Sequence, residues 1–179
     1  MPKLLLLDLD GTVRKSASGA KFIQNPSDQV IIDGARDAIA AYSDWVIIGI
    51  TNQAGVAYGY KSLDDCILEQ KNTIDLLPQI QEIYVCPDKE GTTCFSCGYR
   101  GDTNVWSWMA ISPKTIYKWK PEDSFRKPGI GMVKAAIDSC FLSCYPILMV
   151  GDMESDRECA EAAKIDFMWA DNWRKGKKN

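Results

Sequence analysis

The sequence predicts an α/β fold built on a doubly wound parallel sheet, and two observations favour this class. Short, continuous apolar runs recur along the chain, and segments with helical periodicity and capping residues lie between them. Alternation of strand and helix is typical of a parallel sheet that carries helices on both faces. Ligands bind such sheets at the carboxyl ends of the strands, so the polar residues that end each apolar run are candidates for function.

Five apolar runs are the expected strands. A strand that is buried on both faces shows a continuous apolar run instead of an alternation of apolar and polar residues. The runs cover residues 3–7, 45–50, 82–86, 147–150 and 167–170. Asp8 ends the first run, Thr51 the second and Gly151-Asp152 the fourth, so these polar residues are expected at one edge of the sheet.

Four segments between these runs are expected to be helical, namely residues 33–42, 62–77, 129–139 and 154–164. Asp33 is a candidate cap for the first helix. Ser62-Leu63-Asp64-Asp65 resembles a capping box and opens the second. Pro128 directly precedes the third, where a proline is compatible with a helix start.

Composition indicates a compact globular protein. Of 179 residues, 46% are hydrophobic and 25% are charged, so we expect one domain, residues 1–179, with a sizeable core. The net charge of -3 argues against a dedicated binder of duplex DNA. The chain has no His, which excludes Ser-His-acid and Cys-His catalysis. No stretch approaches the roughly 20 apolar residues of a membrane span. We expect a cytoplasmic monomer.

Residues 87–125 interrupt the alternation of strand and helix. They are rich in Gly, Trp and turn residues and lack helical periodicity, so we expect an insertion with a small fold of its own in place of a large cap. Within the insertion, residues 104–111 and 115–120 are expected to pair as a hairpin around Ser112-Pro113-Lys114.

Four polar motifs follow the expected strands or precede an expected helix. They are Asp8-Leu9-Asp10-Gly11-Thr12, Thr51-Asn52-Gln53, Arg126-Lys127-Pro128 and Gly151-Asp152 with Asp156. The first motif alone is compatible with a solvated turn, because its Gly allows a tight reversal of the chain. Together the motifs supply a nucleophile, an acid-base group, two groups that hold phosphate and a metal-binding acid.

DLDGT, TNQ, RKP and GDxxxD, in this order, resemble the four signature motifs of the haloacid dehalogenase-like superfamily of phosphatases. The resemblance implies a Rossmann-like fold and a phosphomonoesterase that acts through an aspartyl-phosphate. Asp8 would be the nucleophile and Asp10 the acid-base group. Thr51, the backbone N–H of Asn52 and Lys127 would hold the phosphate oxygens.

The same resemblance implies a Mg²⁺ ion held by the Asp8 carboxylate, the Asp10 carbonyl and Asp152. Asp156 would orient Lys127 or a metal-bound water, and the alternative is a surface residue on the following helix. A non-enzymatic receiver domain also combines an acidic pair, a Thr and a Lys on a doubly wound sheet. In receivers the Lys comes last, whereas here an acidic motif follows Lys127.

Two subfamilies compete for the substrate. Residues 51–57, residues 83–87 and the RKP motif resemble the heptose-bisphosphate and histidinol-phosphate phosphatases, which act on small phosphorylated metabolites. Residues 18–22 and 26–28, with Ser155-Asp156-Arg157, resemble the 3'-phosphatase domain of polynucleotide kinases. We expect a small phosphorylated metabolite such as a sugar phosphate or histidinol phosphate, with a polynucleotide 3'-phosphate, a single-stranded nucleic-acid end, as the alternative.

Two groups of residues in and beside the insertion bear on this choice. Cys86, Asp88, Cys94 and Cys97 could ligate a structural zinc ion, with free thiols as the alternative. In the metabolite phosphatases a zinc loop occupies this place, and Asp88 stands where that loop has a His. Trp106, Trp108, Trp119 and Arg126 could contact the substrate, with the Trp rings stacking on bases, and packing of the insertion onto the domain is the alternative.

Overall fold

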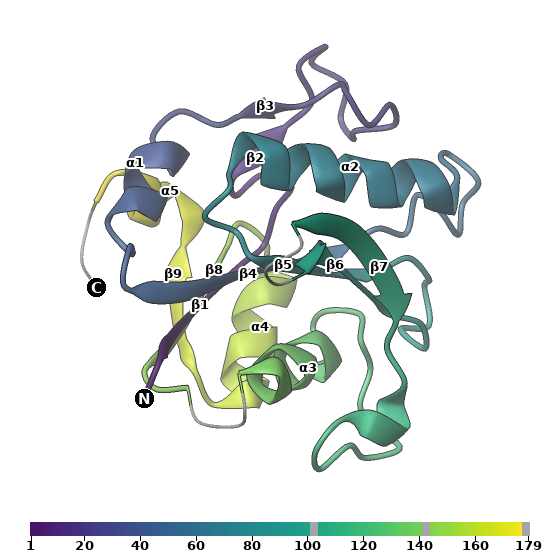
Figure 1. Ribbon diagram of the computed structural model, residues 1–179, viewed down its shortest axis with the longest axis vertical. Helices are drawn as coiled ribbons and strands as arrows, with labels where there is room; N and C mark the ends of the chain where they lie inside the picture. The colour runs from purple at the N-terminus through teal and green to yellow at the C-terminus, as the bar shows by residue number, and fades with distance from the viewer. Residues whose placement is uncertain (101–103, 141–143, 177–179) are drawn as a thin grey trace.

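The computed structural model describes residues 1–100, 104–140 and 144–176, and it shows helices on both faces of a central sheet (Figure 1). The strands of this sheet are β1 (Lys3–Leu7), β4 (Trp45–Asn52), β5 (Glu82–Cys86), β6 (Phe95–Arg100), β7 (Val105–Ala110), β8 (Ile147–Gly151) and β9 (Asp166–Trp169). The helices are α1 (Ala35–Ala40), α2 (Leu63–Leu76), α3 (Gly131–Ser139), α4 (Glu154–Ala163) and α5 (Ala170–Arg174). The predicted α/β fold class is confirmed.

The sheet has the strand order β7-β6-β5-β4-β1-β8-β9. Strands β5, β4, β1, β8 and β9 are parallel to one another, whereas β6 pairs antiparallel with both of its neighbours, β5 and β7. Leu7 at the end of β1 pairs with Gly49 of β4 and with Val150 of β8. The carboxyl ends of β1, β4 and β8 therefore meet at one edge of the sheet, as the sequence predicts.

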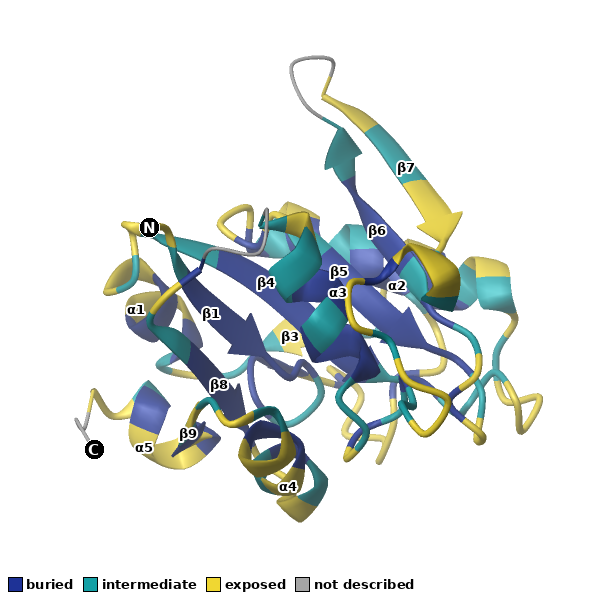
Figure 2. Cartoon of the chain, turned by 90° about the horizontal axis from the view of Figure 1, so that it is seen from below, coloured by how far each residue is buried: buried dark blue, intermediate teal, exposed yellow. Residues whose placement is uncertain are grey.

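Two apolar cores flank the sheet. Leu4 to Leu7 of β1 are fully buried, with alternate side chains on opposite faces, which explains why these four positions are all apolar. On one face β1 packs against α1, α2 and α5, and on the other against α3 and α4. Figure 2 shows the buried strands β1, β4, β5 and β8 at the centre of these layers.

Among the described residues, no helix is long and apolar enough to cross a membrane.

The helix starts confirm some predicted caps and correct others. Ser62 precedes α2, and its hydroxyl accepts a hydrogen bond from the backbone N–H of Asp65 at 3.0 Å, as a capping box requires. The first helix, by contrast, does not begin at the predicted cap Asp33. Gly34 stands at the cap with a φ of 82°, a left-handed conformation that glycine adopts without steric cost.

The insertion forms a different hairpin from the predicted one. β7 pairs antiparallel with β6, with Trp108 opposite Cys97, and extends the main sheet at its edge. Residues 115–120, which were expected to pair with it, form no strand, and a short 3-10 helix, Pro113–Thr115, occupies the predicted turn. The prediction missed β6 because residues 95–100 carry Ser, Gly and Arg and do not form an apolar run. The separate two-stranded sheet of β2 (Arg14–Lys15) and β3 (Val30–Ile31) was also missed, since each strand has two residues.

Truncation of a fully buried β1 side chain should destabilise the protein. Leu5→Ala should lower the free energy of unfolding by about 2–5 kcal/mol, because it removes apolar contacts and leaves a cavity. Leu68→Ala, at an exposed position of α2, should change it by less than about 0.5 kcal/mol. Urea unfolding followed by circular dichroism measures both values. Equal losses in the two variants would contradict the packing described.

Candidate active site

Asp8 is buried where β1 ends, and both oxygens of its carboxylate accept hydrogen bonds. Lys127 Nζ donates to Oδ1 at 2.6 Å, and Thr12 Oγ1 donates to Oδ2 at 3.0 Å. The backbone N–H of Asp8 also bonds to the carbonyl of Val150 at 2.9 Å, which continues the pairing of β1 with β8. The carboxylate is therefore fixed in position and orientation by the sheet and by two side chains.

Lys127 lies between two acids. Its ammonium group is buried and contacts Asp8 Oδ1 at 2.6 Å, Asp156 Oδ1 at 2.8 Å and the carbonyl of Ile50 at 3.0 Å. Burial alone would lower the pKa of Lys127, but the two carboxylates raise it above its usual value. Lys127 is therefore held in its charged form at the edge of the sheet.

The side chain of Asn52 holds the backbone of Lys127. Asn52 Nδ2 donates to the carbonyl of Lys127 at 3.0 Å, and the backbone N–H of Lys127 donates to Asn52 Oδ1 at 3.0 Å. This two-point contact joins the end of β4 to the segment before α3. It also gives Asn52 a role that the sequence analysis did not foresee, since only its backbone N–H was expected to act.

Asp8, Asp152 and Asp156 form an acidic cluster in which one oxygen from each residue lies within 4.8 Å of the others. Asp156 belongs to α4, and its Oδ2 accepts from the backbone N–H of Met153 at 3.0 Å. Burial, and then the charge of Asp156, raise the pKa of Asp152. Burial raises the pKa of Asp8 to about 7, with Lys127 opposing and Asp156 adding to this effect. Three converging carboxylates suit a hard divalent cation, which prefers oxygen ligands.

Two glycines allow the acids to come this close. A Cβ atom on Gly11, whose φ is 87°, would lie 2.1 Å from Asp152 Oδ2. A Cβ atom on Gly151 would lie 2.4 Å from Asp156 Oδ2. Both separations are shorter than non-bonded atoms tolerate, so these two positions next to the acidic cluster require a residue without a Cβ atom.

Asp10 is partly exposed and is held by two side chains. Arg14 Nε donates to Asp10 Oδ1 at 3.0 Å, and Gln53 Nε2 donates to Oδ2 at 2.6 Å. Burial would raise the pKa of Asp10, but the Arg14 guanidinium, with Lys61 and Gln53, holds it below its usual value. Thr51 Oγ1 accepts from Gln53 Nε2 at 2.9 Å and lies 3.5 Å from Asp10 Oδ2.

The structure thus brings together the predicted residues Asp8, Asp10, Thr51, Asn52, Lys127, Asp152 and Asp156 at the carboxyl edge of the sheet. Several supporting residues were not foreseen: Arg14, Gln53, Lys61, Glu69 and Arg174. Gln53 follows the Thr and Asn of its motif, which was a usable signal. Arg174 of α5 donates to the carbonyls of Gly11 and Thr12, the latter at 2.6 Å, although its position near the end of the sequence gave no sign of this contact.

The predicted zinc site is wrong in its geometry. Cys86 and Cys94 belong to the core beside α3, whereas Cys97 belongs to the core beside α2, on the other face of the sheet. Burial raises the pKa of both Cys86 and Cys97 to about 12. Asp88 instead shapes its loop, since its carboxylate accepts from the backbone N–H of Gly91 at 2.7 Å and of Thr93 at 2.8 Å.

The three Trp side chains that were predicted to contact substrate each pack against another aromatic ring of the protein. Trp106 contacts Tyr99 and Trp108 contacts Phe95, each with ring centroids 5.4 Å apart. Trp119 packs on Phe125 at 4.7 Å. Trp106 and Trp108 lie on β7, two strands beyond β5 at the sheet edge, away from the strand ends that carry the acids (Figure 2). The alternative interpretation, that these rings attach the insertion to the domain, fits the structure.

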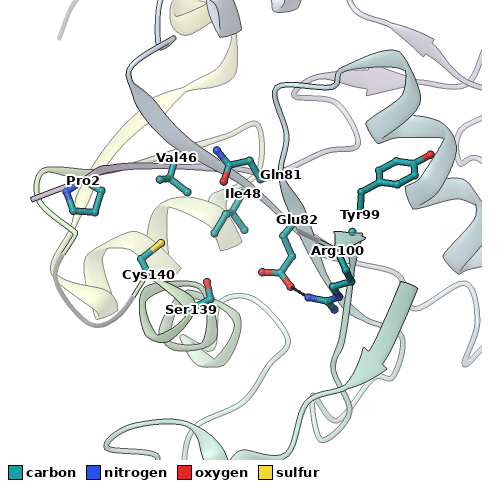
Figure 3. Close-up of a pocket in the computed structure, with 10 residues that line it drawn as sticks. Pro2, Val46, Ile48, Gln81, Glu82, Tyr99, Arg100, Ser139 and Cys140 are labelled. Atoms are coloured by element: carbon teal, nitrogen blue, oxygen red, sulfur yellow. Dashed lines mark hydrogen bonds and ion pairs between the residues drawn. The ribbon is translucent and has the colours of Figure 1, made fainter. Parts of the chain in front are cut away.

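A surface groove lies at the opposite end of the parallel strands from the acidic cluster. Its cavity of about 390 Å³ is lined by residues at or near the amino ends of the strands, including Pro2, Val46 and Glu82 (Figure 3). Glu82 forms an ion pair with Arg100 at 3.3 Å inside this groove. The groove therefore has no part in the arrangement around Asp8.

Other aromatic and cationic side chains lie at the carboxyl end of the strands. Tyr58 and Tyr60, in the loop after β4, are exposed and stack with ring centroids 5.7 Å apart. Lys89, in the loop after β5, places its Nζ 3.7 Å from the centroid of the Tyr58 ring.

Arg126 precedes Lys127, and its Nη1 is buried and has no hydrogen-bond partner among the residues that the structure describes. A buried N–H group of this kind is suited to an acceptor oxygen from a ligand.

Substitution of Gly11 should damage the acidic cluster. Gly11→Ala places a methyl group against Asp152 Oδ2, so we expect metal-dependent activity to fall by roughly 100-fold, as misplaced groups cause in other sites. Gly19→Ala, also at positive φ but with no atom near its Cβ, is the matched control for backbone strain. Steady-state kinetics over a Mg²⁺ titration measures both. Equal activity in the two variants would contradict the described approach.

The raised pKa of Asp8 should make stability depend on pH. Between its usual value of 3.8 and the folded value of about 7, the folded protein holds a proton that the unfolded chain releases. Stability in the absence of metal should therefore fall as pH rises through this interval. From pH 5 to 8, wild type should lose on the order of 2 kcal/mol more than Asp8→Asn does. Unfolding in the presence of a chelator measures this difference, and parallel pH profiles would contradict it.

Comparison with known proteins places the chain in a family. The family model described as "Polynucleotide kinase 3 phosphatase" matches residues 3–173. D-glycero-alpha-D-manno-heptose-1,7-bisphosphate 7-phosphatase of Burkholderia mallei is 26% identical over 170 residues, which cover 91% of this chain and 76% of that protein. D-glycero-beta-D-manno-heptose-1,7-bisphosphate 7-phosphatase of Haemophilus influenzae is 28% identical over 173 residues, covering 92% and 79%.

Solved structures share the fold. D,D-heptose 1,7-bisphosphate phosphatase from B. bronchiseptica, complexed with magnesium and phosphate, superposes with a TM-score of 0.64 at 23% identity, covering 92% of this chain and 78% of that one. A HAD-like phosphatase structure from Mesorhizobium loti superposes with a TM-score of 0.65 at 23% identity, covering 92% and 71%. Because the family model spans nearly all of the sequence and the four motifs converge, the chain belongs to the polynucleotide kinase 3 phosphatase family and is a phosphatase of the haloacid dehalogenase-like superfamily.

Proposed function

We propose that the protein hydrolyses a phosphomonoester of a small phosphorylated sugar through a covalent aspartyl-phosphate on Asp8. The observation that carries this proposal is the Asp8 carboxylate, buried and oriented by Lys127 and Thr12 beside Asp152 and Asp156. Such a group can attack phosphorus in line, because its place and direction are set before the substrate arrives. The chain has no His, so the proton transfers fall to a carboxyl group.

In the first step an Asp8 oxygen attacks phosphorus, the new P–O bond forms, and the bond from phosphorus to the ester oxygen breaks. Asp10 gives its proton to the departing oxygen, which leaves as an alcohol. In the second step Asp10, now a carboxylate, takes a proton from water while the water oxygen attacks phosphorus. Inorganic phosphate leaves and the Asp8 carboxylate is restored.

Asp10 reaches its acid form as the substrate binds. Arg14 and Gln53 hold it as a carboxylate in the free protein. The entering phosphate carries negative charge, and a nearby negative charge favours the protonated state of a carboxyl group. The same group then serves as the base in the second step, once the alcohol has left.

Other residues neutralise and hold the phosphate oxygens. Lys127 supplies a buried positive charge next to the nucleophile, and Thr51 with the backbone N–H of Asn52 supplies neutral donors at the end of β4. Phosphoryl transfer depends on positioning and charge neutralisation more than on bond chemistry from the protein. Asp156 holds Lys127 in place through the 2.8 Å contact.

The donor set fits a Mg²⁺ ion, which the Asp8 and Asp152 carboxylates and the Asp10 carbonyl would hold. The fit rests on three carboxylate oxygens within 4.8 Å of one another, since Mg²⁺ takes hard oxygen ligands. When bound, this ion supplies positive charge that offsets the repulsion between the acids and a phosphate.

A sugar phosphate is the favoured substrate class for two reasons. The curated relatives that match over most of the chain are named as heptose-bisphosphate phosphatases. Arg126, next to Lys127, has a buried N–H group that finds no partner among the described residues. A second phosphate or a hydroxyl group on a sugar would give that N–H an acceptor.

A polynucleotide 3'-phosphate is the second candidate. The family model carries that activity in its description, and the stacked Tyr58 and Tyr60 with Lys89 offer aromatic faces and a cation beyond the carboxyl ends of the strands. Bases stack on such rings without regard to sequence, and a cation attracts the phosphate backbone.

Loss of the nucleophile should abolish turnover. Asp8→Asn should lower kcat by roughly 10³-fold or more, because an amide oxygen cannot form the covalent phosphate, while circular dichroism stays unchanged. Asp44→Asn, at an exposed ion pair with Lys3, is the matched control and should keep full activity. Phosphate release with Mg²⁺ measures both. Full activity in Asp8→Asn would exclude Asp8 as the nucleophile.

The same assay separates the two substrate classes. Sugar phosphates and sugar bisphosphates are compared with a 3'-phosphorylated oligonucleotide at equal enzyme concentration. A higher kcat/KM for a sugar phosphate supports the first proposal. A higher kcat/KM for the oligonucleotide, reduced by Tyr58→Ala, would replace it with nucleic-acid end processing.

A further inference from the structure

Asp10 belongs to a closed ring of five polar side chains, which we call the charge ring: Asp10, Arg14, Glu69, Lys61 and Gln53. Going around it, Asp10 Oδ1 accepts from Arg14 Nε at 3.0 Å and Arg14 Nη2 donates to Glu69 Oε1 at 2.6 Å. Lys61 Nζ donates to Glu69 Oε2 at 2.5 Å and to Gln53 Oε1 at 2.8 Å. Gln53 Nε2 donates to Asp10 Oδ2 at 2.6 Å, which closes the ring.

The charge ring lies inside the protein everywhere except at Asp10. The side chains of Arg14 and Glu69 are fully buried, that of Lys61 is 5% exposed and that of Asp10 is 38% exposed. Two cations and two carboxylates balance, so the ring is neutral as a whole. Buried ion pairs gain little stability over apolar residues of the same size, so stability alone is a weak explanation for this arrangement.

Each hydrogen bond of the charge ring limits the orientation of the side chain that makes the next hydrogen bond. Gln53 can donate to Asp10 only if its amide nitrogen points at the carboxylate, and Lys61 enforces this by occupying the amide oxygen. Glu69 holds Lys61 through one carboxylate oxygen and Arg14 through the other. Both arms that reach Asp10 therefore start from Glu69, on helix α2.

We propose that Glu69 is a positioning residue for the reaction, which acts through Arg14 on one side and through Lys61 and Gln53 on the other to fix the Asp10 carboxyl group where it meets the leaving oxygen. The inference rests on the proposed function, in which Asp10 is the acid. It assigns a role to a residue 55 positions from Arg14 that contacts neither substrate nor nucleophile.

The choice of leaving group tests this role. Benzyl phosphate and p-nitrophenyl phosphate have similar size, but benzyl alcohol is a poor leaving group that needs a proton, whereas p-nitrophenolate departs without one. The ratio kcat/KM covers the steps up to departure of the alcohol and excludes hydrolysis of the aspartyl-phosphate. A misplaced Asp10 should therefore affect the benzyl ester selectively.

Glu69→Gln should lower kcat/KM for benzyl phosphate by roughly 10- to 100-fold and for p-nitrophenyl phosphate by less than about threefold. Lys61→Met, which breaks the arm through Gln53 by a change in the loop before α2, should show the same selectivity and serves if Glu69→Gln does not fold. Asp75→Asn, at an exposed ion pair with Lys71 on the same helix, is the matched control and should leave both values unchanged. Thermal unfolding of each variant monitors the fold.

Equal losses on the two esters, or no loss on benzyl phosphate, would overturn the positioning role and leave Glu69 as a structural residue. An increase in activity on benzyl phosphate would also overturn it, since the ring would then hold Asp10 away from the substrate. Failure of the proposed function looks different: wild type would release no phosphate from either ester, or Asp8→Asn would match wild type.

Discussion

The Lys127 ammonium group, held between the Asp8 and Asp156 carboxylates, is the interaction on which the rest of the site depends. Two carboxylates buried this close repel each other. One buried cation between them offsets this repulsion. Its position follows from the parallel sheet, because the ends of β1 and β4 and the start of α4 meet only where a doubly wound fold brings them to one edge.

A second group of charged side chains, the charge ring, includes Asp10 and pairs two cations with two carboxylates. Around Asp8 the acids outnumber the cations, which is the charge balance that suits the proposed Mg²⁺ ion. Around Asp10 the charges balance within the charge ring, and that carboxyl group is held by hydrogen bonds from Arg14 and Gln53. Two carboxylates that stand two residues apart thus receive different surroundings, which is what a nucleophile and an acid-base group require.

The sequence predicts the five parallel strands, four helices and the converging motif residues because these depend on local patterns. Apolar runs, a capping Ser62 and acids at strand ends are visible in short windows. The errors have a common cause in contacts across the chain. Cys86 and Cys97 look like metal ligands in sequence, yet strand alternation sends them to opposite faces of the sheet. Glu69 reads as an ordinary polar position of a helix until its partner Arg14 is placed beside it.

The contact between Asn52 and Lys127 has a consequence for the segment that separates β5 from the RKP motif. Asn52 holds the backbone of Lys127 at two points, and Phe125, fully buried just before the motif, fixes the chain where the insertion ends. The backbone of Lys127 is thereby fixed by the end of β4 and by the core beside α3. Because β6 and β7 of the insertion extend the main sheet and Cys94 lies in the core beside α3, the insertion folds as one unit with the site that it borders.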